Sequence, residues 1–211
     1  MSTYEDESRS QSIFLAGVSR ETRGRLAQFA DRLLKWNRTI NLISRKDEAA
    51  IWDRHILDSL QLAPLLVPLP DRAIDLGSGG GFPGLVLCIA TGVPFDLVEA
   101  DQRKAAFLRE AARETGAPAR IHATRAERLS LSPAPVVTAR ALAPLSQLLT
   151  LASPFVAPGG YCLFLKGIGV EAELTAAATQ WHMRTERTAS RSAHGASVLR
   201  ISEIVSVVSI G

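Results

Sequence analysis

Features that are scarce in this 211-residue sequence exclude several classes of protein. Its two cysteines, Cys88 and Cys162, both lie in apolar runs, which predicts buried thiols rather than a disulfide framework or a metal site. No apolar run approaches the roughly 20 residues that a membrane helix needs. The polar first ten residues carry Glu5, Asp6 and Glu7, unlike a signal peptide. We therefore expect a cytoplasmic protein that uses neither a membrane nor a metal.

The composition is otherwise that of an ordinary globular protein. Hydrophobic residues make up 46% of the chain and charged residues 21%, which argues against disorder. A chain of this length buries roughly 70% of the surface that it exposes when unfolded, so a substantial core is expected. The formal net charge of +3 permits an anionic partner but does not require one.

The sequence pattern changes near residue 70. Before this point, apolar residues recur at helical spacing, first along residues 26–37 and again along 52–63. Residues 64–70 include three prolines and are typical of a linker. We therefore predict an N-terminal helical extension over residues 1–70 and a second domain over residues 71–211.

Strands and helices alternate after residue 70. Short strands are predicted at 72–76, 95–99, 119–123, 136–139 and 161–165, with helices at 83–90, 103–114 and 145–152. Such alternation predicts an α/β fold with a mostly parallel sheet. Residues 183–190 and 197–208 have the pattern of two consecutive strands, which predicts a C-terminal antiparallel hairpin at the edge of the sheet.

A glycine cluster between the first strand and the next helix is the strongest local signal. The run Asp75-Leu-Gly-Ser-Gly-Gly-Gly-Phe-Pro-Gly84 holds more glycines than a turn from strand to helix needs. Glycine lets the backbone approach a ligand closely. Gly79, Gly81 and Gly84 also satisfy the G-x-G-x-x-G pattern of dinucleotide sites, which by itself is a weak signal.

Two carboxylates favour S-adenosylmethionine over NAD as the ligand of this loop. Asp75 immediately precedes the glycines, where it repels a pyrophosphate and attracts a cationic methionine moiety. The alternative role for Asp75 is a cap of the glycine loop. Glu99 ends the next strand and is placed to accept hydrogen bonds from both ribose hydroxyls of either cofactor.

Two further strand ends add candidates at the same edge of the sheet. Ala126 and Glu127 follow the third strand and are expected to frame an adenine, although a glutamate facing a helix dipole explains the pattern nearly as well. Arg140 follows the fourth strand, at the position where amine methyltransferases keep an Asn/Asp-Pro-Pro-aromatic loop. This chain has neither that loop nor a nucleophilic side chain at the position. An arginine there can hold a phosphate or the O6/N7 edge of guanine. A salt bridge to Glu99 or Glu127 is the alternative.

Several segments, taken in chain order, resemble one known family. They are Asn41-Leu, Arg54-His-Ile-Leu-Asp-Ser59, the glycine run, Glu99-Ala-Asp-Gln-Arg-Lys104, Arg125-Ala-Glu127, Arg140-Ala141 and Leu165-Lys-Gly167. Over roughly residues 25–200 the chain resembles the 16S ribosomal RNA guanine-N7 methyltransferases, historically called glucose-inhibited division protein B. It departs from that pattern at Ile40 and Ile43, where an aromatic residue and a threonine are expected.

The resemblance implies a Rossmann-like S-adenosylmethionine-dependent methyltransferase fold behind the helical extension. The expected target is N7 of guanine 527, in the 530 loop of 16S ribosomal RNA, either naked or in a small-subunit precursor. The residues implied to contact S-adenosylmethionine are Gly77, Phe82, Ala126, Glu127 and Arg140. Guanine N7 carries a lone pair and no proton, so methyl transfer to it needs no general base and can rest on positioning and charge complementarity.

Basic side chains are expected to contact the RNA. The fold is predicted to gather three of them near the carboxyl edge of the sheet: Arg125, Lys166 and Arg200. Lys166 ends a strand, where burying a lysine that has no function would be costly. We name Arg140 and Lys166 as the catalytic candidates. His55 is counted with the RNA-binding candidates, although its apolar helix face favours a partly buried, structural histidine.

Two other functions remain open on the sequence. One is a methyltransferase fold that acts on a small molecule, because fold alone does not fix a substrate. The other is an NAD-dependent oxidoreductase, which Asp75 argues against. Thermal stabilisation by S-adenosylmethionine and not by NAD separates the alternatives.

Overall fold

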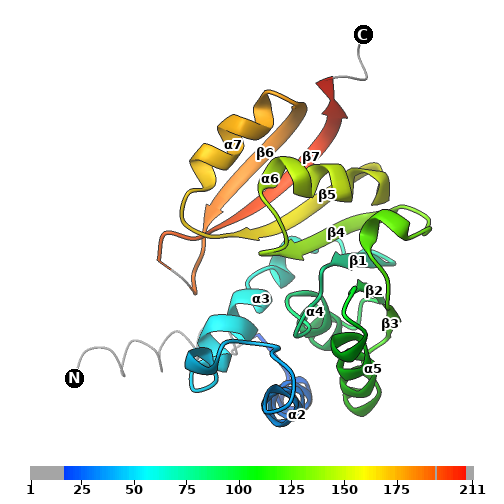
Figure 1. Ribbon diagram of the computed structural model, residues 1–211, viewed down its shortest axis with the longest axis vertical. Helices are drawn as coiled ribbons and strands as arrows, with labels where there is room; N and C mark the ends of the chain where they lie inside the picture. Colours follow the sequence, from blue (N-terminus) through cyan, green and yellow to red (C-terminus); the bar gives the residue numbers. More distant parts are fainter. Residues whose placement is uncertain (1–16, 193, 208–211) are drawn as a thin grey trace.

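A seven-stranded sheet runs through the centre of the computed structural model, which describes residues 17–192 and 194–207 (Figure 1). The strands are β1 (Ala73–Leu76), β2 (Phe95–Val98), β3 (Ala119–His122), β4 (Ala134–Arg140), β5 (Val156–Lys166), β6 (Trp181–Ala189) and β7 (Ser197–Ser206). Their order across the sheet is β3-β2-β1-β4-β5-β7-β6. The first five strands are parallel, which confirms the predicted α/β class.

The C-terminal strands form the predicted antiparallel hairpin. Strand β7 inserts between β5 and β6 and is antiparallel to both, so β6 becomes the edge of the sheet. The described part of β7 ends at Ser206, and residue 208, the predicted end of this strand, lies outside the described residues. Helix α7 (Val170–Ala178), which the sequence did not predict, precedes the hairpin. Its apolar face is narrow: Val170 and Ala177 are buried and Leu174 packs against the same core, which gives a weak signal in the sequence.

The helices after residue 70 begin and end where their capping residues stand. Helix α4 (Gly84–Thr91) ends at Gly92 in the left-handed conformation. Helix α5 (Gln102–Thr115) begins at Asp101, whose side chain accepts hydrogen bonds from two backbone N–H groups of the first turn. Helix α6 (Leu145–Ala152) coincides with its predicted range.

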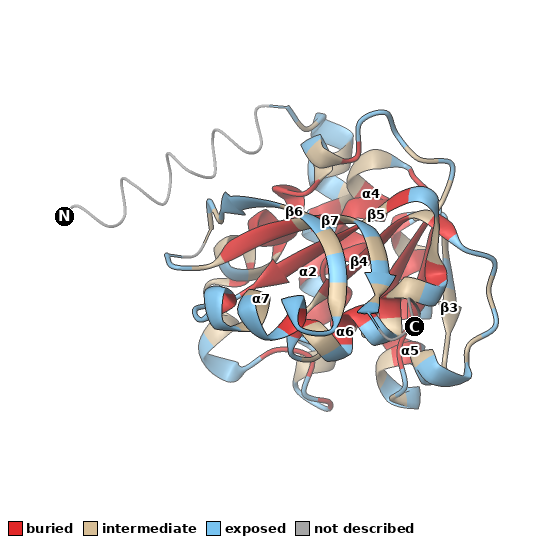
Figure 2. Ribbon diagram, turned by 90° about the horizontal axis from the view of Figure 1, so that it is seen from above, coloured by how far each residue is buried: buried red, intermediate tan, exposed pale blue. Residues whose placement is uncertain are grey.

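Helices cover both faces of the sheet. Side chains alternate across each strand, so Phe95 and Leu97 pack on the same side as α4, α5 and the N-terminal helix α2 (Arg20–Asn37). Ile74 and Leu76 point to the opposite side, where α6 and α7 lie. Figure 2 shows buried residues concentrated along the middle of the sheet. Both cysteines lie in this interior, as predicted.

The N-terminal segment packs into the same core as the sheet. After α2 it forms a 3-10 turn (Arg45–Asp47), a π-helical turn (Trp52–Leu57) that continues into α3 (Asp58–Leu60), and a second 3-10 turn (Ala63–Leu65). The helix expected along 52–63 is therefore largely π-helical. Apolar residues of this segment belong to one cluster with those of β2, α4 and α5. The division into domains at residue 70 remains a prediction.

Candidate active site

An open cavity of about 390 Å³ lies at the carboxyl ends of the parallel strands β1 to β4. Ligands of open α/β sheets bind at this edge, at the point where the connections that follow two neighbouring strands run to opposite faces of the sheet. The sequence-predicted residues that line it are Gly77, Gly79, Glu99, Arg125, Ala126, Glu127 and Arg140. The structure therefore brings most of the predicted cofactor residues into one site.

The glycine loop forms the floor of this first cavity. Gly77 has φ of +68°, a left-handed conformation that favours glycine. A Cβ atom at this position would lie 2.6 Å from Cδ1 of Leu142, which also lines the cavity. The backbone conformation thus favours glycine here, and a larger residue would also have to displace the flexible side chain of Leu142.

Glu99 fastens the glycine loop to the start of α5. Its Oε2 accepts a hydrogen bond of 2.8 Å from the backbone N–H of Gly79, and its Oε1 accepts one of 2.8 Å from that of Asp101. Each carboxylate oxygen accepts more than one hydrogen bond. Glu99 lines the cavity and so retains acceptor capacity toward a ligand.

Asp75 lies beneath the loop instead of in the cavity wall. It is fully buried, and its Oδ1 accepts a hydrogen bond of 2.6 Å from Oγ1 of Thr138. Gly84 packs so closely that a Cβ atom there would lie 2.7 Å from Oδ2 of Asp75. Burial raises the pKa of Asp75 to about 6, although hydrogen bonds from Ser78 and Thr138 oppose the shift. This placement matches the alternative role of a support for the loop.

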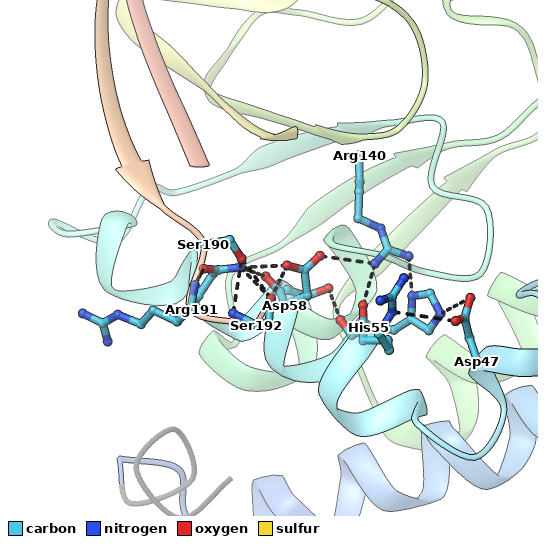
Figure 3. A network of polar contacts seen from close by, with 10 residues as sticks. Asp47, His55, Asp58, Arg140, Ser190, Arg191 and Ser192 are labelled. Carbon is cyan, nitrogen blue, oxygen red and sulfur yellow. Dashed lines mark hydrogen bonds and ion pairs between the residues drawn. The ribbon is translucent and has the colours of Figure 1, made fainter. Parts of the chain in front are cut away.

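Arg140, at the end of β4, makes its polar contacts with the N-terminal segment (Figure 3). Its Nη2 donates to Nδ1 of His55 at 2.8 Å, and its Nη1 lies 3.4 Å from Oδ2 of Asp58. Nη1 also donates to the carbonyl oxygen of Arg54 at 3.3 Å. Burial lowers the pKa of Arg140, and Asp58 opposes the shift. The alternative role, a salt bridge to Glu99 or Glu127, is not the one seen, because the π-helical turn and the start of α3 supply the acceptors.

His55 is a neutral hydrogen-bond acceptor for Arg140. A guanidinium only donates, so Nδ1 of His55 carries no proton in this contact. Burial, and secondly the charge of Arg140, lower the pKa of His55 to about 4. The ring stacks on Phe82 with centroids 4.9 Å apart. His55 is thus the partly buried histidine of the alternative interpretation.

Phe82 supports the site from outside the first cavity. It is not among the residues that line this cavity, although the resemblance implied a cofactor contact. Its ring instead carries the imidazole of His55 and lies 4.9 Å from Cζ of Arg140. Phe82 therefore fixes the orientation of both polar side chains.

Asp58 joins Arg140 to the connection between β6 and β7. Its Oδ1 accepts hydrogen bonds from Nε2 of Gln61, at 2.8 Å, and from the hydroxyl of Ser192. Oε1 of Gln61 accepts a hydrogen bond of 2.9 Å from the backbone N–H of Arg191. Figure 3 shows Asp58 in a network of polar contacts with Arg140 and Ser192. The sequence motif Arg54–Ser59 contains Asp58, but nothing local indicated a partner more than a hundred residues away.

A second cavity of about 340 Å³ adjoins the first. The two share Arg140 and Ala141 as lining residues. Ala141 has φ of +49°, which is unusual for a residue with a side chain and is often found at functional sites. The other residues that line the second cavity include Asp58, Lys166, Ile168, Glu173 and Ser197. Neither Ile168 nor Glu173 was singled out by the sequence, because α7 was not predicted.

The three basic residues expected at this edge do not all lie there. Lys166 ends β5 and lines the second cavity, and the exposed Arg125 lines the first. The placement of Arg200 at the edge is wrong. Arg200 lies on β7 opposite Leu163 of β5, and its guanidinium covers the ring of Tyr161 at 4.1 Å. Because β7 runs antiparallel to β5, it starts at the carboxyl edge with Ser197, opposite Lys166, and Arg200 lies further from that edge.

Lys166 is buried with a paired charge. Its side chain is only 6% exposed, and Nζ lies 2.6 Å from Oε2 of Glu173. Nζ also donates to the carbonyl oxygen of Ala143 at 2.9 Å. The ion pair and the hydrogen bond offset the desolvation cost of burying the lysine ammonium group. They also make Lys166 a wall of the second cavity rather than an exposed phosphate contact.

Neither a metal cluster nor a membrane span is found among the described residues. Within 17–192 and 194–207, no group of three or more histidine, cysteine or acidic side chains is arranged to hold a metal ion. No described helix is both long and apolar enough to cross a membrane.

Comparison with known sequences gives a consistent result. Residues 23–199 match the family described as rRNA small subunit methyltransferase G. A Ribosomal RNA small subunit methyltransferase G from Granulibacter bethesdensis is 59% identical over 189 residues, which cover 90% of this chain and 89% of the relative. Another from Gluconobacter oxydans is 52% identical over 191 residues, covering 90% and 98%.

Solved structures share the fold at low sequence identity. The N-methyltransferase NodS from Bradyrhizobium japonicum, in complex with S-adenosyl-L-homocysteine, has a TM-score of 0.56 and 13% identity, covering 81% of this chain and 96% of that one. The ribosomal protein L11 methylase from Lactobacillus delbrueckii has a TM-score of 0.56 and 15% identity, covering 71% and 78%. The sheet is therefore that of the S-adenosylmethionine-dependent methyltransferases, as predicted.

Proposed function

Because this chain belongs to the rRNA small subunit methyltransferase G family, we propose that it transfers the methyl group of S-adenosylmethionine to N7 of a guanine in 16S ribosomal RNA. The observation that carries the proposal is the position of Arg140, which forms a wall of both cavities at the carboxyl edge of a methyltransferase sheet. A cofactor and a target base can each occupy one cavity and meet beside this residue. The proposed partner is 16S ribosomal RNA, alone or in a small-subunit precursor, in the cytoplasm.

The residues of the first cavity fit S-adenosylmethionine. Gly77 lines the cavity and carries no side chain, so its backbone can approach a ligand closely. Glu99 offers both carboxylate oxygens to ribose hydroxyls, while Ala126 and Glu127 border the part of the cavity suited to adenine. The bound cofactor supplies an electrophilic methyl group on a cationic sulfur.

Asp75 acts on the cofactor from beneath the loop in this proposal. Its carboxylate is shielded from solvent, so its negative charge is felt more strongly in the cavity than an exposed charge would be. The contact with Thr138 on β4 also holds the strand end that carries Arg140. Asp75 therefore stabilises a cationic ligand without touching it.

Methylation at N7 suits the protonation states of the site. N7 carries no proton, so no side chain has to remove one. The buried histidine uses its Nδ1 lone pair on Arg140, and Asp58 and Glu173 are paired with cations. Arg140 can donate to guanine O6, which lies beside N7 on the same edge of the base. Positioning and charge complementarity then supply the catalysis.

The experiment is in vitro methylation of 16S ribosomal RNA and of small-subunit particles that lack the modification. Radiolabelled S-adenosylmethionine reports transfer, and reduction followed by aniline cleavage locates N7-methylguanine. We expect one labelled guanine, in the 530 loop. Label on another atom, or transfer only to small molecules, contradicts the proposal. Stabilisation by NAD but not by S-adenosylmethionine contradicts the cofactor assignment.

A further inference from the structure

The second cavity combines a mixed set of polar groups with one exposed apolar side chain. Buried Lys166 and partly exposed Glu173 form an ion pair among the residues that line only this cavity, and Arg140 lines both cavities. Its volume of about 340 Å³ falls in the range of small-molecule sites. Enzymes that modify a base inside folded RNA or duplex DNA extrude it into such a pocket.

The chemistry of the proposed function fixes how a guanine must sit there. N7 has to face the first cavity, and therefore the wall made by Arg140 and Ala141. O6 shares that edge with N7. The pairing edge, which meets the first edge at O6, carries the N1–H and exocyclic N2 donors. It then faces the wall formed by residues that line the second cavity alone. This wall requires a hydrogen-bond acceptor.

Glu173 is an acceptor on that wall. Its Oε2 receives Nζ of Lys166 at 2.6 Å and the backbone N–H of Leu145 at 2.7 Å. The side chain is nevertheless 29% exposed and lines the cavity. An ionised carboxylate accepts through two oxygens, so Oε1 is available to donors on a ligand.

Ile168 supplies an apolar surface beside the same cavity. The residue is 85% exposed, which is unusual for isoleucine, and it lines the pocket together with Lys166. Extruded bases are held by hydrogen bonds to their pairing edge and by stacking on aromatic or apolar side chains. Ile168 and Glu173 together provide both kinds of contact.

We propose that the second cavity holds the extruded target guanine and that Glu173 selects guanine by accepting hydrogen bonds from N1–H and the N2 amino group. Lys166 is a positioning residue that holds the Glu173 carboxylate. Adenine is rejected because its N1 presents a lone pair to the carboxylate. This inference rests on the proposed function, since N7 sets the orientation of the base.

The test compares RNA fragments that carry guanosine or inosine at the methylated position. Inosine retains N7, O6 and N1–H but lacks the N2 amino group. We expect wild-type protein to lose roughly ten- to hundred-fold in kcat/KM on inosine, as for loss of one base-specific contact. Glu173→Gln and Glu173→Ala should be slow on guanosine, and their guanosine-to-inosine ratio should fall close to one.

Glu171→Gln is the matched control. Glu171 lies on the same helix and pairs with Arg187 rather than with a residue of the cavity. This variant should keep the wild-type ratio between the two RNAs. A shift of its ratio equal to that of Glu173→Gln contradicts the assignment.

A structural role for Glu173 is separated by a further readout. Glu173→Gln retains a carbonyl oxygen for the N–H of Leu145, so it should fold, and its affinity for S-adenosylmethionine should match wild type. Equal losses on guanosine and inosine would overturn the inference and leave Glu173 as a support for α6. If wild-type protein methylates neither RNA at N7, the proposed function itself fails, and this outcome is distinct from a failure of guanine selection.

Discussion

Arg140 at the end of β4 donates a hydrogen bond of 2.8 Å to Nδ1 of His55 in the π-helical turn of the N-terminal segment. The same guanidinium forms part of the wall of both cavities. The orientation of a residue on the methyltransferase sheet is therefore set by residues that precede the sheet in sequence. π-helical turns occur frequently at functional sites. Here the turn and the first residue of α3 supply acceptors to one arginine.

Arg140→Lys should lower methylation turnover more than it lowers stability. An ammonium group cannot span His55 and Asp58 as the planar guanidinium does. We expect turnover to fall by roughly 10²- to 10³-fold, as for loss of one preorganised donor in other enzymes. Arg72→Lys is the control, because Arg72 pairs with buried Asp96 near the amino ends of β1 and β2, at the other edge of the sheet from the cavities. Single-turnover rates and melting temperatures are compared. Normal rates with a lowered melting temperature would leave Arg140 a structural residue.

Gly77→Ala should weaken the binding of S-adenosylmethionine, because the added methyl group displaces the flexible side chain of Leu142 within the cofactor cavity. The new Cβ atom would lie 2.6 Å from Cδ1 of Leu142, and both residues line the first cavity. Gly92→Ala is the matched control, since Gly92 has a similar φ of +73° and no atom lies within 4 Å of the place that its Cβ would take. Both variants should lose about 1–2 kcal/mol of stability from the left-handed backbone. Calorimetric titration decides: equal affinities in the two variants would remove the loop from the cofactor site.

Arg125→Ala should reduce the salt dependence of RNA binding. Arg125 is exposed and lines the first cavity. Loss of one phosphate contact lowers the slope of log K against log salt by about one. Arg120→Ala is the control, because exposed Arg120 borders a separate cavity beside Arg72 and Asp96. Binding is measured between roughly 50 and 200 mM salt, the range over which such slopes are resolved. An unchanged slope for Arg125→Ala would remove it from the RNA surface.

His55→Asn should remove an acid-sensitive contribution to stability. The pKa of His55 is about 4 in the folded protein against an ordinary value of 6.5, so the unfolded chain binds more protons between these pH values. The stabilisation is complete above pH 6.5 and is lost as pH falls to 4. It amounts to roughly 3 kcal/mol.

Asparagine keeps an acceptor for Arg140 and does not titrate. Urea unfolding of both proteins between neutral pH and the folded-state pKa of His55 gives the difference in unfolding free energy. The titration of Asp75, which has the opposite sign because its folded pKa is raised, is common to both proteins and cancels. A difference that stays constant over this range would show that His55 does not titrate as described.

Short-range patterns in the sequence determined much of the fold and the first cavity. The alternation of strands and helices, the caps at Gly92 and Asp101, and the glycine loop depend on residues that are close in the chain. Parallel strands also bring their carboxyl ends to one edge. For that reason Glu99, Ala126 and Arg140 could be placed together correctly from the strand pattern.

Long-range packing decided the rest. Sequence alone left two roles for Asp75, and the close approach of Gly84 and Thr138 put it beneath the loop. Arg140 pairs with Asp58 rather than Glu99 because the N-terminal segment folds back against the end of β4. The antiparallel hairpin moved Arg200 away from the edge. Glu173 pairs with Lys166 from a short helix whose narrow apolar face gave only a weak signal in the sequence. Spacing along the chain reports which face or edge a residue occupies, whereas the partner of a buried charge is chosen by whichever distant segment packs against it.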